Sequence, residues 1–200
     1  MKIHDVLRHL ALGSAFLLAA CAGDQSVNRE ANLALEPMAK PASPPAENQF
    51  QGLGASSAKL TGSQAGKLYW EVFDGDDVGC SFDNDGWFAP SEKWTDCGGS
   101  TGTQNFTKSG DIWPLKVGNT ESYDITGKDQ QYDWQTTRRC EVKDAVTLTV
   151  AETAYPTYEV VCSDRFNVRT WYVSPDLQRI IRFKRYNNSR GLLTDMTAVL

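Results

Sequence analysis

Several segments in the second half of the chain alternate hydrophobic and polar residues with a period of two. Val146, Leu148 and Val150, for example, alternate with Thr147 and Thr149. Side chains along a strand point to opposite faces in turn, so this alternation predicts strands with one buried and one water-facing side. The predicted strands are 68–73, 122–125, 132–142, 146–150, 158–162, 168–173, 179–186 and 193–199. No ten-residue segment has convincing helical periodicity.

Turn-forming residues separate these segments. They are Val117-Gly118-Asn119, Thr126-Gly127, Lys143-Asp144, Ser174-Pro175-Asp176 and Asn187-Asn188. Short strands joined by close turns pair antiparallel, because a parallel pair needs a long crossover connection. We therefore predict a mainly β fold, an antiparallel sandwich or a half-open barrel.

The first twenty residues have a different pattern, with Lys2 and Arg8 followed by an apolar run over 10–20. The run is too short to span a membrane as a helix but suits a secretory signal peptide. It ends in Leu18-Ala19-Ala20-Cys21, which resembles the lipobox of bacterial lipoproteins. The resemblance implies cleavage before Cys21 and acylation of that cysteine, which would anchor the chain to a membrane. Ala22, where aspartate would imply inner-membrane retention, implies an outer-membrane anchor facing the periplasm of a two-membrane cell. The alternative is an ordinary signal peptide followed by a chance cysteine.

The chain downstream of the signal divides into two parts by composition. Residues 21–66 hold four prolines, many small and polar residues and one aromatic residue, Phe50. Such a stretch buries too little apolar area to offset the entropy of ordering it, so we predict a lipidated cysteine followed by a disordered tether. Residues 67–200 hold all six tryptophans and are predicted to form a single β-rich domain.

Removal of the signal changes the charge and the available chemistry. The chain has 20 basic and 25 acidic residues, and loss of Lys2, Arg8 and Asp5 leaves 18 and 24, a net charge of -6. An acidic chain is a poor nucleic-acid binder, so no nucleic-acid partner is predicted. Both histidines, His4 and His9, lie in the signal. The mature chain therefore offers no imidazole as a general base or as a metal ligand, and we predict no catalytic residue and no cofactor.

Four cysteines remain once Cys21 is assigned to lipid: Cys80, Cys97, Cys140 and Cys162. Three disulfide pairings are open in an oxidising compartment, and we favour the local one, Cys80–Cys97 with Cys140–Cys162. If the strand at 146–150 lay between the strands of Cys140 and Cys162, those cysteines would be about 10 Å apart and out of reach. The local pairing therefore predicts that it does not. A four-cysteine zinc site is the alternative, although no Cys-x-x-Cys pair is present.

Five segments resemble a β-rich domain that recurs in uncharacterised exported bacterial proteins. They are 113–120 (WPLKVGNT), 140–142 (CEV), 146–151 (VTLTVA), 171–175 (WYVSP) and 181–182 (IR). The chain departs from the pattern at Glu152, Tyr155 and Gln178. The resemblance covers roughly 113–186; it implies a β fold and a Cys140–Cys162 pair, and it carries no activity.

Two groups of residues are candidate binding sites. Trp87, Trp94 and Trp113 would suit stacking on sugar rings if all were exposed on one face, and core packing is the alternative. Asp74, Asp76 and Asp85 resemble a weak calcium loop, but Val78 stands where an oxygen ligand belongs, and a solvated hairpin loop is the alternative. The basic residues Arg138, Arg139, Arg179, Arg182, Lys184 and Arg185 are interpreted as a solvated sheet face.

We therefore expect a membrane-anchored periplasmic lipoprotein that acts through binding or envelope assembly, with an envelope protein or glycan as partner. The alternatives are a glycan or peptidoglycan binder that uses the three tryptophans, a lipid or small-ligand carrier, and a hydrolase. The carrier requires a hydrophobic cavity inside the sheet. The hydrolase requires two carboxylates facing each other across a cleft.

Overall fold

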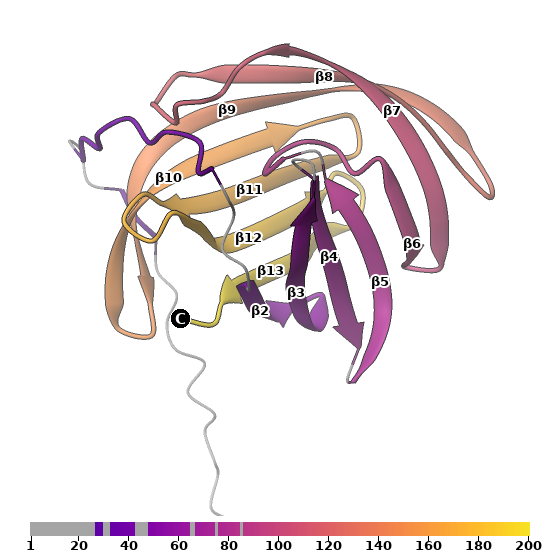
Figure 1. Cartoon of the computed structure of the whole chain (residues 1–200), viewed down its shortest axis with the longest axis horizontal. Helices are drawn as coiled ribbons and strands as arrows, with labels where there is room; N and C mark the ends of the chain where they lie inside the picture. The colour runs from indigo at the N-terminus through magenta and orange to yellow at the C-terminus, as the bar shows by residue number, and fades with distance from the viewer. Residues whose placement is uncertain (1–26, 30–32, 43–47, 65–66, 75, 85) are drawn as a thin grey trace, which may run out of the picture.

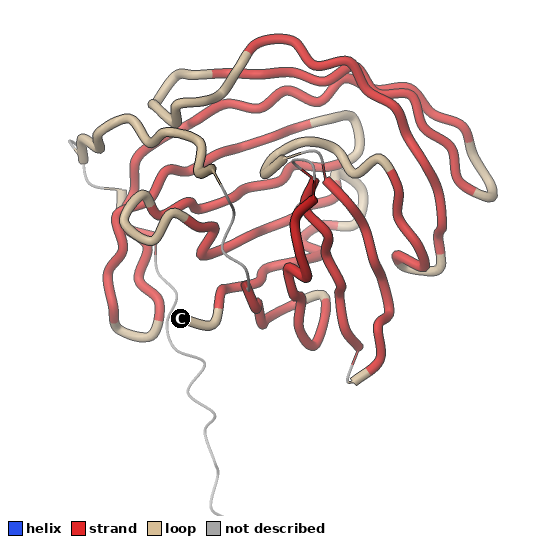
Figure 2. The backbone as a smooth tube through the Cα atoms, viewed as in Figure 1, coloured by secondary structure: helices blue, strands red, loops and turns tan. Residues whose placement is uncertain are grey.

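The structure, a computed structural model, describes residues 27–29, 33–42, 48–64, 67–74, 76–84 and 86–200. The predicted signal peptide and Cys21 lie outside the described residues. Strands and the connections between them make up the whole described part (Figure 2). No described segment is a helix long and apolar enough to cross a membrane. The strands are β1 (Val27–Asn28), β2 (Asn48–Leu53), β3 (Ala55–Gln64), β4 (Lys67–Asp74), β5 (Asp77–Asn84), β6 (Lys93–Cys97), β7 (Ser100–Gly110), β8 (Thr120–Asp129), β9 (Asp133–Val150), β10 (Thr153–Ser163), β11 (Asn167–Ser174), β12 (Arg179–Asn187) and β13 (Gly191–Ala198).

The twelve strands β2 to β13 form a closed antiparallel barrel (Figure 1). Each strand pairs with the next along the chain, and β13 pairs with β2 to complete the circle. The prediction of a mainly β, antiparallel fold is confirmed, with full closure in place of a half-open barrel. Closure leaves no edge strand in the circle, so every strand has two partners for its backbone hydrogen bonds.

The alternating segments all lie in strands, but two predicted turns do not exist. Lys143-Asp144 is a bulge inside β9, where the register to β10 steps from Asp144 to Val142, so 132–142 and 146–150 belong to one strand. A bulge adds a residue without ending the strand. Thr126-Gly127 lies within β8. Strands β5, β6 and β7 were not predicted, because their sequences are rich in Gly, Ser, Thr and Asp.

The predicted tether is wrong for residues 48–64, which form β2 and β3 and close the barrel. The small residues that indicated disorder are needed for close approach to β13. A Cβ atom on Gly52 would lie 2.2 Å from the backbone oxygen of Asp195, and one on Gly54 would lie 2.5 Å from that of Leu193. Phe50 of β2 is buried and contributes an apolar side chain from this segment to the core. The folded unit therefore begins well before residue 67.

Both favoured disulfides are present. Cys80–Cys97 joins β5 to β6 with Cα atoms 4.5 Å apart, and Cys140–Cys162 joins β9 to β10 with Cα atoms 4.0 Å apart. Cys140 and Cys162 are direct register partners. Val146–Val150 continues the strand of Cys140 and does not lie between the two cysteines, as the local pairing requires.

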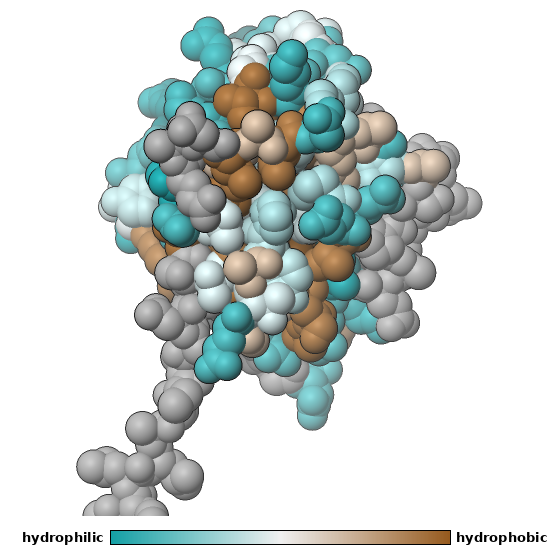
Figure 3. All heavy atoms as spheres, turned by 90° about the vertical axis from the view of Figure 1, so that its left-hand side faces the viewer, coloured by the Kyte–Doolittle hydropathy of each residue, from teal (hydrophilic) through white to brown (hydrophobic). Residues whose placement is uncertain are grey.

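The two ends of the barrel differ in their connections. At the end that we call the hairpin end, all six connections have one to three residues, as at Gly54 and at 130–132. The opposite end, the loop end, has the long connections 85–92 and 111–119. Figure 3 faces the side of the molecule where segment 33–42 and the β9–β10 turn lie, and hydrophobic residues surface there in separate groups among hydrophilic ones.

The long connections fold into the loop end and fill it. Phe88 stacks on Trp113 with ring centroids 5.8 Å apart and meets Trp171 edge-on at 5.4 Å. Ile112 and Leu115 are fully buried, and Leu115 forms a β-bridge with Met38. The hydroxyl of Tyr158 donates to the backbone oxygen of Glu36 at 2.7 Å. The core is therefore concentrated at this end.

A second, smaller hydrophobic cluster lies on the outer face of the barrel. Val146, Leu148 and Val150, the residues with the clearest alternation, point away from the main core and pack with Tyr172 and Ile181. Val27 of β1 packs against this cluster. Arg29 follows and pairs with buried Glu159 at 2.7 Å, and Glu159 also accepts from the Tyr172 hydroxyl at 3.1 Å. The segment that leads into the barrel is thereby held on its outer face.

Barrel closure can be tested at Gly52. Gly52→Ala should lower the free energy of unfolding by at least about 2 kcal/mol, because φ is +146° and the new Cβ atom would clash with the backbone of β13. Gly98→Ala is the matched control, since φ is +64° with no atom within 4 Å, and should cost about 1 kcal/mol. Denaturant unfolding measures both variants, and equal losses would contradict the close β2–β13 contact.

Candidate functional site

The inner wall carries a row of four aromatic side chains, which we call the aromatic row: Trp70 (β4), Phe82 (β5), Trp94 (β6) and Trp134 (β9). The row runs from Trp134, beside the β8–β9 turn of the hairpin end, to Trp70, whose ring lies 5.6 Å from that of Phe50 in the main core. Trp70 and Phe82 stack with ring centroids 6.3 Å apart, and Phe82 is the register partner of Trp94. Trp94 and Trp134 approach to 5.6 Å across β7 and β8. The row is therefore continuous around this part of the wall.

Two glycines make room for the tryptophans. A Cβ atom on Gly102 of β7 would lie 2.2 Å from the Trp94 ring, and one on Gly127 of β8 would lie 2.5 Å from the Trp134 ring. The rings therefore lie flat over the backbone of the two strands that separate them. This packing explains why Gly127, which sequence patterns assign to a turn, is needed inside a strand.

The aromatic row points inward but is not fully buried. Trp134 shares the inward side of β9 with Cys140 and Val142, which are buried in the core. All four members of the row are nevertheless partly exposed, whereas Phe88 and Tyr158 at the loop end are 1% exposed. In a closed barrel, solvent reaches an inward side chain only through an end. Trp134 lies beside the β8–β9 turn, so the hairpin end is the side from which water reaches the row.

Three arginines share the inner wall with the aromatic row, and we call them the arginine cluster: Arg138 (β9), Arg169 (β11) and Arg185 (β12). Arg169 and Arg185 are register partners, and Arg169 also pairs with inward-facing Cys162. Asp164, in the β10–β11 connection, accepts from Arg169 Nη1 at 2.7 Å and from Arg138 Nε at 3.4 Å. One carboxylate thus pairs with two of the three guanidinium groups.

Burial and charge affect both partners in this group. Burial, followed by repulsion from Arg169, lowers the pKa of Arg138 to about 9 although Asp164 opposes the shift. Burial alone would raise the pKa of Asp164, but Arg169 and Arg138 lower it below its usual range. The backbone N–H groups of Phe166 and Asn167 also donate to Asp164. This carboxylate therefore holds both the β10–β11 turn and two members of the arginine cluster, Arg138 and Arg169.

The predicted basic face is split by the period of the strands. Arg138 is buried on the inner wall, whereas its neighbour Arg139 is exposed on the outer face. Arg185 faces inward, and Arg182 and Lys184 face outward, where both pair with Asp195. The interpretation as one solvated sheet face is therefore wrong, since successive residues of a strand point to opposite faces.

The three candidate tryptophans do not form one exposed face. Trp87 is only 7% exposed and meets Trp113 edge-on at 5.8 Å inside the loop end. Trp94 belongs to the aromatic row instead. Two of the three therefore serve packing, and the third lines the inner wall with Trp134.

The candidate calcium ligands are not brought together among the described residues. Asp74 and Asp76 lie at the β4–β5 turn, whereas Asp85 follows the opposite end of β5 and lies outside the described residues. In the described part of the chain, no group of three His, Cys, Asp or Glu side chains is placed to hold a metal ion.

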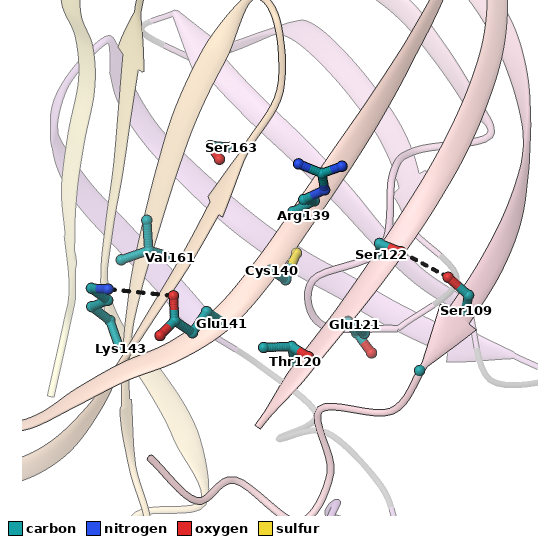
Figure 4. A pocket seen from close by; sticks show the side chains of 11 residues that line it. Ser109, Thr120, Glu121, Ser122, Arg139, Cys140, Glu141, Lys143, Val161 and Ser163 are labelled. Carbon is teal, nitrogen blue, oxygen red and sulfur yellow. Dashed lines mark hydrogen bonds and ion pairs between the residues drawn. The ribbon is translucent and has the colours of Figure 1, made fainter. Parts of the chain in front are cut away.

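A shallow groove of about 640 Å³ lies on the outer face of β7 to β10 (Figure 4). Its lining is mostly hydroxyl and charged groups, and several of these satisfy one another. Lys143 pairs with Glu141 at 3.4 Å, and the hydroxyls of Ser109 and Ser122 are 2.7 Å apart. The groove lacks the apolar wall typical of ligand sites, so the inner wall of the hairpin end is the stronger candidate.

Comparisons with known proteins give no match: no family model, no curated protein and no solved structure resembles this chain.

The role of Asp164 can be tested by stability measurements. Asp164→Asn should lower the free energy of unfolding by about 3 kcal/mol near neutral pH, because Arg138 would stay buried without its carboxylate partner. Asp176→Asn, in the exposed β11–β12 connection, should change it by less than about 0.5 kcal/mol.

The same variant predicts a pH dependence. The pKa of Asp164 is lower in the folded state, so its stabilisation is present above its unfolded pKa and is lost as pH falls through the folded value. The difference in unfolding free energy between wild type and Asp164→Asn should therefore shrink below about pH 4. A difference that stays constant down to pH 2 would show that the carboxylate charge does not stabilise the barrel.

Proposed function

We propose that this chain is a bacterial envelope lipoprotein whose barrel binds an apolar small molecule at the inner wall of the hairpin end, without catalysing a reaction. The observation that carries the proposal is the aromatic row, which faces the barrel interior and yet remains partly exposed. The lipid or small-ligand carrier is the sequence-based alternative that this geometry favours.

The energetics of the aromatic row support a ligand. Each ring leaves apolar area in contact with water, and burial of that area by a ligand is favourable by roughly 25 cal/mol per Å². Trp94 and Trp134 are fixed by the glycines beneath them, so little side-chain entropy would be lost on binding. A rigid, partly hydrated aromatic wall is typical of small-molecule sites.

The filled loop end supports a single entrance. Phe88, Ile112 and Leu115 are almost completely buried there, and Met38 bridges to Leu115 from the preceding segment. A ligand would therefore enter and leave at the hairpin end, where the connections are short. This arrangement suits a carrier or a receptor that delivers its ligand to a partner in the envelope.

A non-catalytic role agrees with the state of the inward carboxylates. Glu121 pairs with Lys108 at 2.9 Å and accepts from the Tyr123 hydroxyl at 2.6 Å. Asp164 is held by two arginines. Carboxylates engaged in this way stabilise the barrel, and neither is left to act as a general acid or base.

Binding can be tested with 12-bromododecan-1-ol, whose bromine quenches tryptophan fluorescence on contact. The wild-type chain should show saturable quenching. Thr136→Phe should weaken binding about tenfold, because Thr136 is the inward, partly exposed residue of β9 between Trp134 and Arg138.

The matched control is Thr137→Phe, at the adjacent outward position of β9. It adds the same ring to the outer face and should leave the titration unchanged. Quenching that does not saturate, or that is equally affected by both substitutions, would overturn the proposal.

The envelope anchor is tested separately at Cys21, which lies outside the described residues. Cells supplied with radiolabelled palmitate should label the wild-type chain, and Cys21→Ser should abolish labelling and release the chain from the membrane fraction. In a two-membrane bacterium, Ala22→Asp should keep the labelled chain in the inner membrane. Membrane association that survives Cys21→Ser would rule out the lipid anchor.

A further inference from the structure

The arginine cluster has more positive charge than the barrel neutralises. Arg169 (β11) is the electrostatic neighbour of both Arg185, on the adjacent strand, and Arg138, two strands away on β9. In the described part of the chain, Asp164 is the single carboxylate paired with the cluster, through Arg138 and Arg169. The other buried inward carboxylate, Glu121, is already paired with Lys108. The cluster therefore retains a net charge of about +2, by count of the ionised groups.

Donor groups of the cluster are also left over. Arg138 is 7% exposed, and its Nε donates to Asp164 over a long distance of 3.4 Å. Arg185 makes no hydrogen bond or ion pair to another described residue. The unused donors of Arg185, beside two further guanidinium groups, are therefore free to bind an anion that reaches this wall.

The cluster and the aromatic row lie on the same wall. Arg138 and Trp134 are four residues apart on β9, with Thr136 as the inward residue between them, which places their backbones about 13 Å apart. A twelve-carbon chain is of similar length. One molecule could therefore lie against the aromatic row and reach the arginines with its head.

We propose that the ligand of the barrel is an amphiphile with a single acidic head group, which the arginine cluster binds while the aromatic row holds the apolar body. The inference rests on the proposed function. Guanidinium groups match the planar, two-oxygen geometry of a carboxylate and bind phosphate oxygens in the same way, through paired N–H donors. The cluster would thus select acidic over neutral amphiphiles.

The test compares 12-bromododecanoate with 12-bromododecan-1-ol, which share the chain and the quenching bromine and differ in the charge of the head. The wild-type chain should bind the acid at least about tenfold more tightly than the alcohol. Arg185→Gln should reduce this preference to about threefold or less. Arg185 is exposed at the rim and pairs with no described residue, so the variant should fold.

Arg139→Gln is the matched control, because Arg139 adjoins Arg138 on β9 but lies exposed on the outer face. It removes the same charge and should leave the tenfold preference intact. If acid and alcohol bind with equal affinity, or if Arg139→Gln and Arg185→Gln reduce the preference alike, the acidic head group is wrong while apolar binding stands. If neither probe gives saturable quenching, the proposed function itself fails.

Discussion

The pairing of β13 with β2 is the contact on which the rest of the structure depends. Without it, the sheet would end in two long edges with unpaired backbone groups, and its inner face would open to water. The pairing requires a close backbone approach that only glycine permits at positions 52 and 54. Once the circle is closed, one set of side chains faces a common interior, and burial there depends on which end is filled.

The strands of the second half could be predicted from sequence because their alternation reports local geometry. Val146, Leu148 and Val150 predict a strand correctly, yet they face the outer cluster with Val27 and not the main core. Periodicity shows that a strand is present and which residues share a face. Which of the two faces points into the barrel depends on the bulge at Lys143-Asp144. The first half was predicted poorly. The Gly, Ser and Ala residues of 48–64 are typical of disordered segments, and only the pairing of β2 with β13 and β3 explains why they form strands here.

The candidate site could be predicted only in part for a similar reason. The local disulfide pairing was favoured among the three that four cysteines allow, and both of its bonds are present. Arg138 and Arg139 look alike in the sequence, and only the register of β9 places one inside and the other outside. The tryptophans were grouped by sequence proximity, whereas the barrel groups Trp94 with the distant Trp134. Alternation around Trp134, with polar residues on both sides, was the one signal that could have placed it on an inner wall.

The first strand of the barrel begins at the loop end, and the last strand ends there. β2 begins there at Asn48, and β13 reaches it at Ala198, just beside the start of β2. A fusion partner, affinity tag or surface linker attached after Leu200 would therefore emerge on the side opposite the short hairpins. Immobilisation through that terminus would present the hairpin end to solution, which makes the chain suited to surface-based binding measurements without rearrangement of its strands.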